Sequence, residues 1–134
     1  MSTVAQATPH SRPAVRALVV AQLATIGGFL AVLLSYLVRM ATAGVGPAEM
    51  LTGAYDPKDM LFFWLHAPVA VLYLVGAVLG PPLALVAVAV VAREREALPR
   101  ATRALLLTGA VGTVLVLVAR FTPPLLDMHR WWMD

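Results

Sequence analysis

The sequence predicts an all-α integral membrane protein with three transmembrane helices, the second long and kinked at Gly80-Pro81-Pro82. Of its 134 residues, 60% are apolar and 13% are charged, against about 25% charged residues in soluble domains. Three segments, residues 17–38, 61–92 and 104–119, contain no charged residue. A helix needs about 20 apolar residues to cross a hydrocarbon layer of roughly 30 Å. The lipid bilayer is therefore the solvent of this chain.

The hydropathy pattern divides the chain into seven parts. They are a mobile cytoplasmic arm (1–13), a first transmembrane helix (14–40), an extracytoplasmic loop (41–59), a second, kinked transmembrane helix (60–93), a cytoplasmic turn (94–100), a third transmembrane helix (101–121) and an extracytoplasmic interfacial tail (122–134).

The first apolar segment is expected to stay in the protein as a helix. Its uncharged run of 22 residues, from 17 to 38, is longer than the roughly 7–15 residues of a signal-peptide core. A helical period places small and polar residues on one arc, which we expect to face protein, since small residues allow close helix contact. The arc comprises Thr25, Gly28, Val32, Ser35, Tyr36 and Arg39.

The loop before the second helix is rich in glycine and proline, and residues 47–51 are expected to form one short helical turn. The second helix is predicted to begin near Pro57, with Asp56 as its N-cap. Its uncharged run of 32 residues would be roughly 48 Å long as a straight helix. A break at Pro81 would leave too few residues for a further span, so one tilted and kinked helix is the better interpretation.

The third helix is expected to end before Pro124, because a proline disfavours helix at the residue that precedes it. The tail that follows contains Trp131 and Trp132, which are predicted to lie at the level of the lipid headgroups.

The distribution of basic residues predicts the orientation. Cytoplasmic flanks carry an excess of Lys and Arg, and here the two sides differ by six to four. The amino terminus is then cytoplasmic and the carboxyl terminus extracytoplasmic, in a multi-pass protein of the cell membrane. The two sets are Arg12, Arg16, Arg93, Arg95, Arg100 and Arg103 on one side, and Arg39, Lys58, Arg120 and Arg130 on the other.

His66 is the histidine that lies within an apolar segment, and it shares a helix face with Tyr73. Ionisable groups at membrane depth are costly and often mark a site. A haem or a quinone could lie over this face, with haem b shared with a partner chain because one histidine cannot supply both axial ligands. The alternatives are an interfacial histidine that keeps its polar edge wet and a proton relay.

Helix-packing seams are predicted where small residues recur at one-turn spacing. Gly76 and Gly80 form a GxxxG pattern, in which two glycines one turn apart leave a groove for another helix. The seams of the three helices allow either a compact bundle or docking into a larger one. The predicted packing residues are Gly28, Ser35, Gly76, Gly80, Gly109 and Gly112.

A copper site is a further candidate, with Met128, His129 and Met133 as its ligands. Thioether and imidazole groups suit Cu(I), but these methionines do not form the closely spaced clusters typical of copper carriers. Methionine is also a common core residue.

The sequence therefore predicts a small non-catalytic accessory or anchor subunit of a larger membrane complex, most consistent with respiratory or other electron transfer. The chain has no enzyme motif, no cysteine and no acid within its apolar segments. Its basic residues are scattered at helix ends, which argues against nucleic-acid binding. The expected partners are the lipid bilayer and other membrane subunits. The alternative is a self-contained homo-oligomeric small transporter or a copper-binding membrane protein.

Overall fold

Three long apolar helices make up most of the protein. The computed structural model describes the backbone of residues 2–57 and 63–133, and the side chains of residues 13–57 and 64–133. Its helices are α1 (Ser2–Ala43), α2 (Pro47–Met50), α3 (Phe63–Arg93), α4 (Arg100–Arg120) and α5 (Pro123–Met133).

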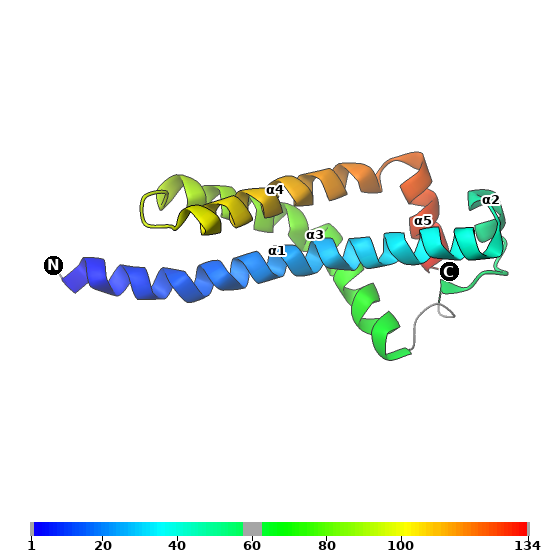
Figure 1. Ribbon diagram of the computed structural model, residues 1–134, viewed down its shortest axis with the longest axis horizontal. Helices are drawn as coiled ribbons and strands as arrows, with labels where there is room; N and C mark the ends of the chain where they lie inside the picture. The colour runs from blue at the N-terminus through cyan, green and yellow to red at the C-terminus, as the bar shows by residue number, and fades with distance from the viewer. Residues whose placement is uncertain (1, 58–62, 134) are drawn as a thin grey trace.

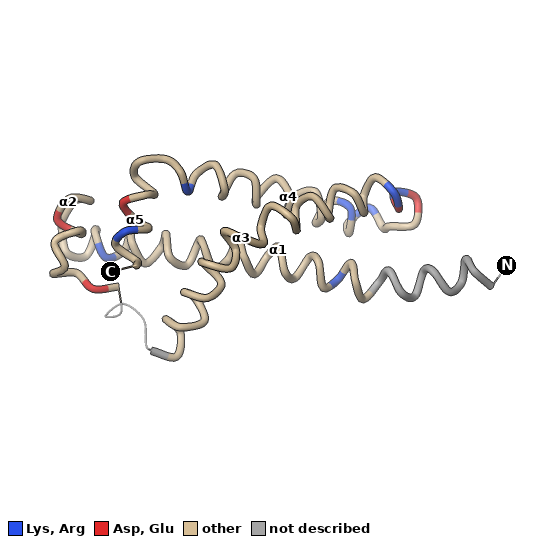
Figure 2. Tube along the Cα trace, turned by 180° about the vertical axis from the view of Figure 1, so that it is seen from behind, with Lys and Arg blue, Asp and Glu red and all other residues tan. Residues whose placement is uncertain are grey.

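The three predicted membrane spans are present. Stretches of α1, α3 and α4, namely Pro13–Ala43, Trp64–Arg93 and Arg100–Arg120, are long and apolar enough to cross a bilayer. Charged residues gather at the two ends of the molecule, and the middle of the helices is free of them in Figure 2. The protein is thus an all-α, multi-pass membrane protein.

The element boundaries differ from the predicted ones mainly at the amino terminus. Helix α1 begins at Ser2, whereas residues 1–13 were predicted to be an arm outside the helix. The end of α3 at Arg93 matches the predicted end, and α4 is displaced by one residue at each end. The boundary predicted at residue 60 lies outside the described residues, and α3 is described from Phe63, whereas the helix was predicted to begin near Pro57. The short helical turn predicted at 47–51 is present as α2.

Helix α1 ends in a Schellman motif. Gly44 has a φ of 65°, a left-handed conformation that glycine adopts at little cost. The Val45 N–H donates to the Met40 carbonyl at 3.1 Å, which is the 6→1 bond of that motif. The chain thereby reverses and leads into α2.

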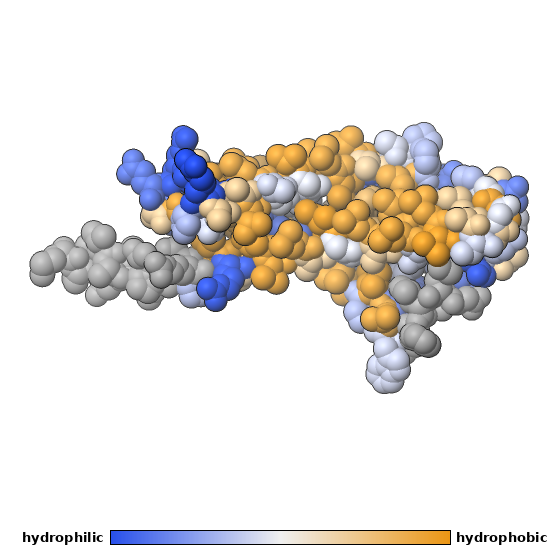
Figure 3. Space-filling view, viewed as in Figure 1, coloured by the Kyte–Doolittle hydropathy of each residue, from blue (hydrophilic) through white to orange (hydrophobic). Residues whose placement is uncertain are grey.

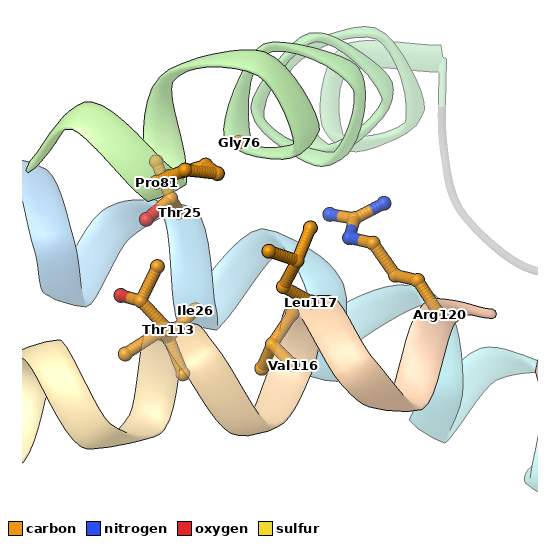
Figure 4. Close-up of a pocket in the computed structure, with 8 residues that line it drawn as sticks. All are labelled: Thr25, Ile26, Gly76, Pro81, Thr113, Val116, Leu117 and Arg120. Carbon is orange, nitrogen blue, oxygen red and sulfur yellow. The ribbon is translucent and has the colours of Figure 1, made fainter. Parts of the chain in front are cut away.

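Helix α3 continues through Pro68, Pro81 and Pro82. Each proline removes one backbone hydrogen bond, yet an apolar segment has no water to satisfy an unravelled backbone, so helix remains the favoured structure. The α3 ribbon runs obliquely across α1 near its start and alongside α4 near its end (Figure 1). Its change of direction near Pro81 is visible in Figure 4, at the position where the sequence predicts a kink.

Small residues allow the three long helices to approach closely. A Cβ atom on Gly28 would lie 2.7 Å from the Leu72 Cβ, and one on Gly109 would lie 2.6 Å from the Gln22 Oε1. Both distances are shorter than real Cβ contacts. At Gly28 the neighbours include the Leu72 backbone, so a larger residue would separate two helices, whereas at Gly109 the Gln22 side chain would have to move.

The two glycines of the GxxxG pattern contact different helices. A Cβ on Gly76 would lie 3.1 Å from the Thr25 Cβ of α1, and one on Gly80 would lie 3.0 Å from the Thr113 Cγ2 of α4. These seams therefore hold this chain together, and since α4 also packs on α1 through Gly109 and Gly112, the three long helices contact one another in pairs.

The arc predicted on α1 faces the interior, because Thr25, Val32, Ser35 and Tyr36 are all buried. The Ser35 hydroxyl donates to the Ala31 carbonyl at 2.8 Å within α1. Its one hydroxyl proton is thus used within α1, and its small size suits a close contact with a neighbouring helix.

Candidate functional site

The densest group of polar and aromatic side chains lies where α5 meets the ends of the three spans, which we call the α5 end. Helix α5 folds back beside α1 and α2 (Figure 1). Met128, Trp131 and Trp132 are exposed by only 0%, 1% and 4%. The indole of Trp131 donates a hydrogen bond to the Tyr55 carbonyl, and its ring centroid lies 5.3 Å from that of Tyr36.

Both tryptophans are buried against this chain's own helices, and their predicted depth at the level of the lipid headgroups stays a prediction. Met128, Trp131 and Trp132 recur at helical spacing, so one side of α5 can be buried while the other stays polar. That apolar side packs against this chain's own helices, and the Tyr55 carbonyl supplies the polar partner that a buried indole needs.

The predicted His66 and Tyr73 face is covered by α5. The His66 ring stacks on Trp132 with centroids 4.5 Å apart. Tyr73 is 1% exposed, and its hydroxyl lies 3.0 Å from the Nδ1 atom of His129. A planar cofactor on this face would therefore have to displace the side chains of α5.

Arg120, at the end of α4, points into the protein and links three helices (Figure 4). Its Nη2 atom donates to the Tyr73 carbonyl at 2.9 Å. Its guanidinium carbon lies 4.4 Å from the centre of the Tyr73 ring and 5.1 Å from that of Phe29. A guanidinium at membrane depth is costly, and the carbonyl and the two aromatic faces offset that cost.

A small cavity lies beneath Arg120, between α1, α3 and α4. Thr25, Gly76, Pro81 and Thr113 are among the residues that line it, and its volume is about 10 Å³. A volume near 10–15 Å³ is the space that one water molecule needs. The cavity is thus too small for a quinone or a haem, and the polar Thr and Arg side chains suit a single water.

The three residues predicted to bind copper face different surroundings. Met128 is fully buried in the core, Met133 is 53% exposed, and His129 contacts the Tyr73 hydroxyl. In the part of the chain that the structure describes, no group of three or more His, Cys, Asp or Glu side chains could hold a metal ion.

Several buried polar atoms lack a hydrogen-bond partner among the described residues. They include the Nδ1 atom of His66 and both polar atoms of the Gln22 side chain. Gln22 is 1% exposed and lies against Gly109, so an amide is enclosed within the membrane-spanning part of the bundle. An unpaired buried amide is costly.

The predicted site residues include neither the buried amide of Gln22 nor Arg120 with its inward contacts. A single amide inside the uncharged segment 17–38 is the signal that could have identified Gln22. For Arg120, the signal is its place on the same helical arc as Gly109, Gly112 and Thr113.

The fold and the α5 end together define a three-span membrane protein whose polar groups mostly bind one another. No protein-family model, no curated protein and no solved structure matches this chain.

Proposed function

We propose that the protein is a small non-catalytic accessory or anchor subunit of a larger membrane complex. The observation that supports this most is the small fraction of each span that is buried within the protein. Only 28% of the most apolar stretch of α1 is buried, and 22% of those of α3 and α4. The long helices therefore expose most of their length to lipid or to other membrane subunits.

Large apolar side chains project from all three spans. Leu34 of α1 is 61% exposed, Val78 of α3 is 73% exposed and Leu115 of α4 is 64% exposed. Lipid covers such faces as readily as protein does, because helix association in a bilayer depends on packing and not on the hydrophobic effect. These positions are accordingly the ones at which partner contact can be tested.

The polar groups at the α5 end support a structural role over a catalytic one. Arg120 binds a carbonyl, Trp131 binds a carbonyl, and Tyr73 and His129 bind each other. A catalytic group must reach a substrate, whereas these groups are directed at their own neighbours. This supports a scaffold whose end is closed by α5.

Among membrane complexes we favour a respiratory or other electron-transfer assembly. His66 keeps its Nδ1 atom without a hydrogen-bond partner in the described structure, beside the stacked ring of Trp132. Such an imidazole is a candidate axial ligand for a haem whose second ligand comes from a partner. Haem binding there requires α5 to move aside.

Affinity purification from native membranes in digitonin tests the proposal. The expected result is a set of stoichiometric partner polypeptides, together with a dithionite-reduced absorption band of a b-type haem. The chain isolated alone would overturn the accessory-subunit proposal. Partners without a haem band would overturn only the electron-transfer part.

A His66→Ala variant separates haem ligation from packing. Loss of the haem band from a complex that still assembles supports ligation. An unchanged band in the assembled complex would show that His66 only packs against Trp132.

A further inference from the structure

Three arginines border one open hollow at the α3–α4 turn, the end of the molecule opposite α5. Arg95, Arg100 and Arg103 line it together with apolar residues such as Val88 and Leu107, and its volume is about 690 Å³. The space-filling view shows strongly hydrophilic residues at this end directly beside the apolar surface of the spans (Figure 3). The hollow is therefore basic at its rim and apolar at its base.

No acidic side chain lines this hollow among the described residues. Glu94 borders a different hollow, between α1 and α3. The ion pair found in the described structure, between Arg130 and Asp127, is at the α5 end. The charged residues that line the hollow are thus the three arginines, which give it a positive charge.

The start of α4 adds further positive potential to the hollow. The first turn of α4 contains no acidic residue, and its N-cap residue, Pro99, provides no side-chain hydrogen bond. The free N–H groups and the dipole of a helix favour an anion at its amino terminus. Arg100 and Arg103 in that turn are unfavourable neighbours for the dipole unless an anion lies between them.

An apolar groove continues from this hollow toward the middle of the membrane. Val88 also borders a second hollow of about 450 Å³ between α3 and α4, whose lining extends to Pro81 and includes Leu85 and Val111. From Pro81 to its end at Arg93, α3 rises by roughly 18 Å. Half of a hydrocarbon layer measures about 15 Å, so the groove is long enough for one acyl chain below a headgroup.

We propose that the α3–α4 groove binds one anionic phospholipid, with its phosphate among Arg95, Arg100 and Arg103 and an acyl chain along the groove to Pro81. Basic pockets at membrane boundaries bind anionic headgroups, and the guanidinium group has the geometry to bind phosphate with two hydrogen bonds. The apolar groove binds the acyl chain, which a free anion lacks.

Lipid titration of the full-length protein in dodecyl maltoside, with native mass spectrometry, tests the proposal. Dioleoyl-phosphatidylglycerol is compared with dioleoyl-phosphatidylcholine, which has the same acyl chains and no net charge. We expect the anionic lipid to bind at least about tenfold more tightly. Equal affinity for the two lipids would overturn the proposal.

Two double variants with the same loss of charge separate a specific site from general attraction. Arg95→Gln/Arg103→Gln removes two arginines of the hollow, and Arg16→Gln/Arg93→Gln removes two from the same end but outside it. We expect the first to weaken phosphatidylglycerol binding about thirtyfold and the second by less than about threefold. Equal losses would contradict a defined site.

Two further measurements separate a lipid site from a free phosphate site. Val88 is 49% exposed, so Val88→Trp can fill the groove without disturbing the core. It should weaken phosphatidylglycerol binding about tenfold, because the acyl chain loses its place. If millimolar inorganic phosphate displaced phosphatidylglycerol completely and Val88→Trp left the lipid affinity unchanged, the lipid proposal would be overturned.

Discussion

The two ends of the molecule use arginine in different ways. At the α5 end, the Arg120 guanidinium turns inward, binds the Tyr73 carbonyl and lies over two aromatic rings. At the α3–α4 turn, Arg95, Arg100 and Arg103 face an open hollow. A basic residue at a helix end of this protein therefore links helices where carbonyls and rings surround it, and remains available for a ligand where they do not.

The largest expected effect is at the centre of the α5 end. Replacing Trp131 by Ala removes a buried ring that contacts Tyr36 and donates to the Tyr55 carbonyl. The free energy of unfolding in mixed detergent micelles should fall by about 3–5 kcal/mol. Phe121 is 71% exposed at the same end, and Phe121→Ala should cost less than about 1 kcal/mol. Similar losses for the two variants would mean that α5 does not pack as described.

Arg120→Gln tests whether the inward arginine links the helices. Loss of its charge-assisted hydrogen bond and ring contacts should lower the free energy of unfolding by about 2–3 kcal/mol. Arg130 is 68% exposed and pairs with Asp127, so Arg130→Gln should cost less than about 1 kcal/mol in the same assay.

Arg103→Gln in lipid-free detergent tests whether the arginines at the α3–α4 turn contribute to stability as Arg120 does. That variant should leave the free energy of unfolding within about 0.5 kcal/mol. A loss as large as that of Arg120→Gln would remove the distinction between linking and ligand-binding arginines.

Adjacent glycines on α1 offer a smaller and closely matched comparison. A Cβ on Gly28 would collide with Leu72, whereas a Cβ on Gly27 has no neighbour within 4 Å among the described residues. Gly28→Ala should lower the thermal unfolding midpoint, with a loss of about 1–2 kcal/mol. Gly27→Ala should be neutral or stabilising, because alanine favours helix. A stable Gly28→Ala variant would contradict the close contact of α1 with α3.

A small loss of stability is also expected on removal of the Tyr73–His129 hydrogen bond. Tyr73→Phe keeps the ring and removes the hydroxyl, so the free energy of unfolding should fall by about 1 kcal/mol. A double-mutant cycle with His129→Ala isolates the coupling between the two side chains. A coupling energy near zero would show that this hydrogen bond contributes nothing to closing the α5 end.

Hydropathy and breaker residues predicted the spans, the end of α3 and the short turn that became α2. These features depend on local composition, which the sequence carries directly. The glycine pattern predicted small faces but not their partners. Gly76 and Gly80 share one pattern, yet one lies against α1 and the other against α4, because the partner of a seam depends on the arrangement of all three helices.

The contacts at the α5 end could not be predicted from local sequence patterns. Tryptophan suits both a lipid headgroup layer and a protein core with a carbonyl nearby, and the carbonyl that Trp131 binds belongs to Tyr55, far away in the chain. In the sequence, Arg120 is one of the basic residues that predict the orientation. Its inward contacts depend on Tyr73, which the chain brings close only after folding.

Site-specific photo-cross-linking in native membranes tests the accessory-subunit proposal most directly. A photoreactive residue at Leu34, Val78 or Leu115 would project from an exposed face of each span, and one at Trp132 serves as the buried control. The expected result is a discrete cross-link to another membrane protein from at least one exposed face and only intramolecular products from Trp132. Lipid adducts alone from all three exposed positions would contradict the proposal.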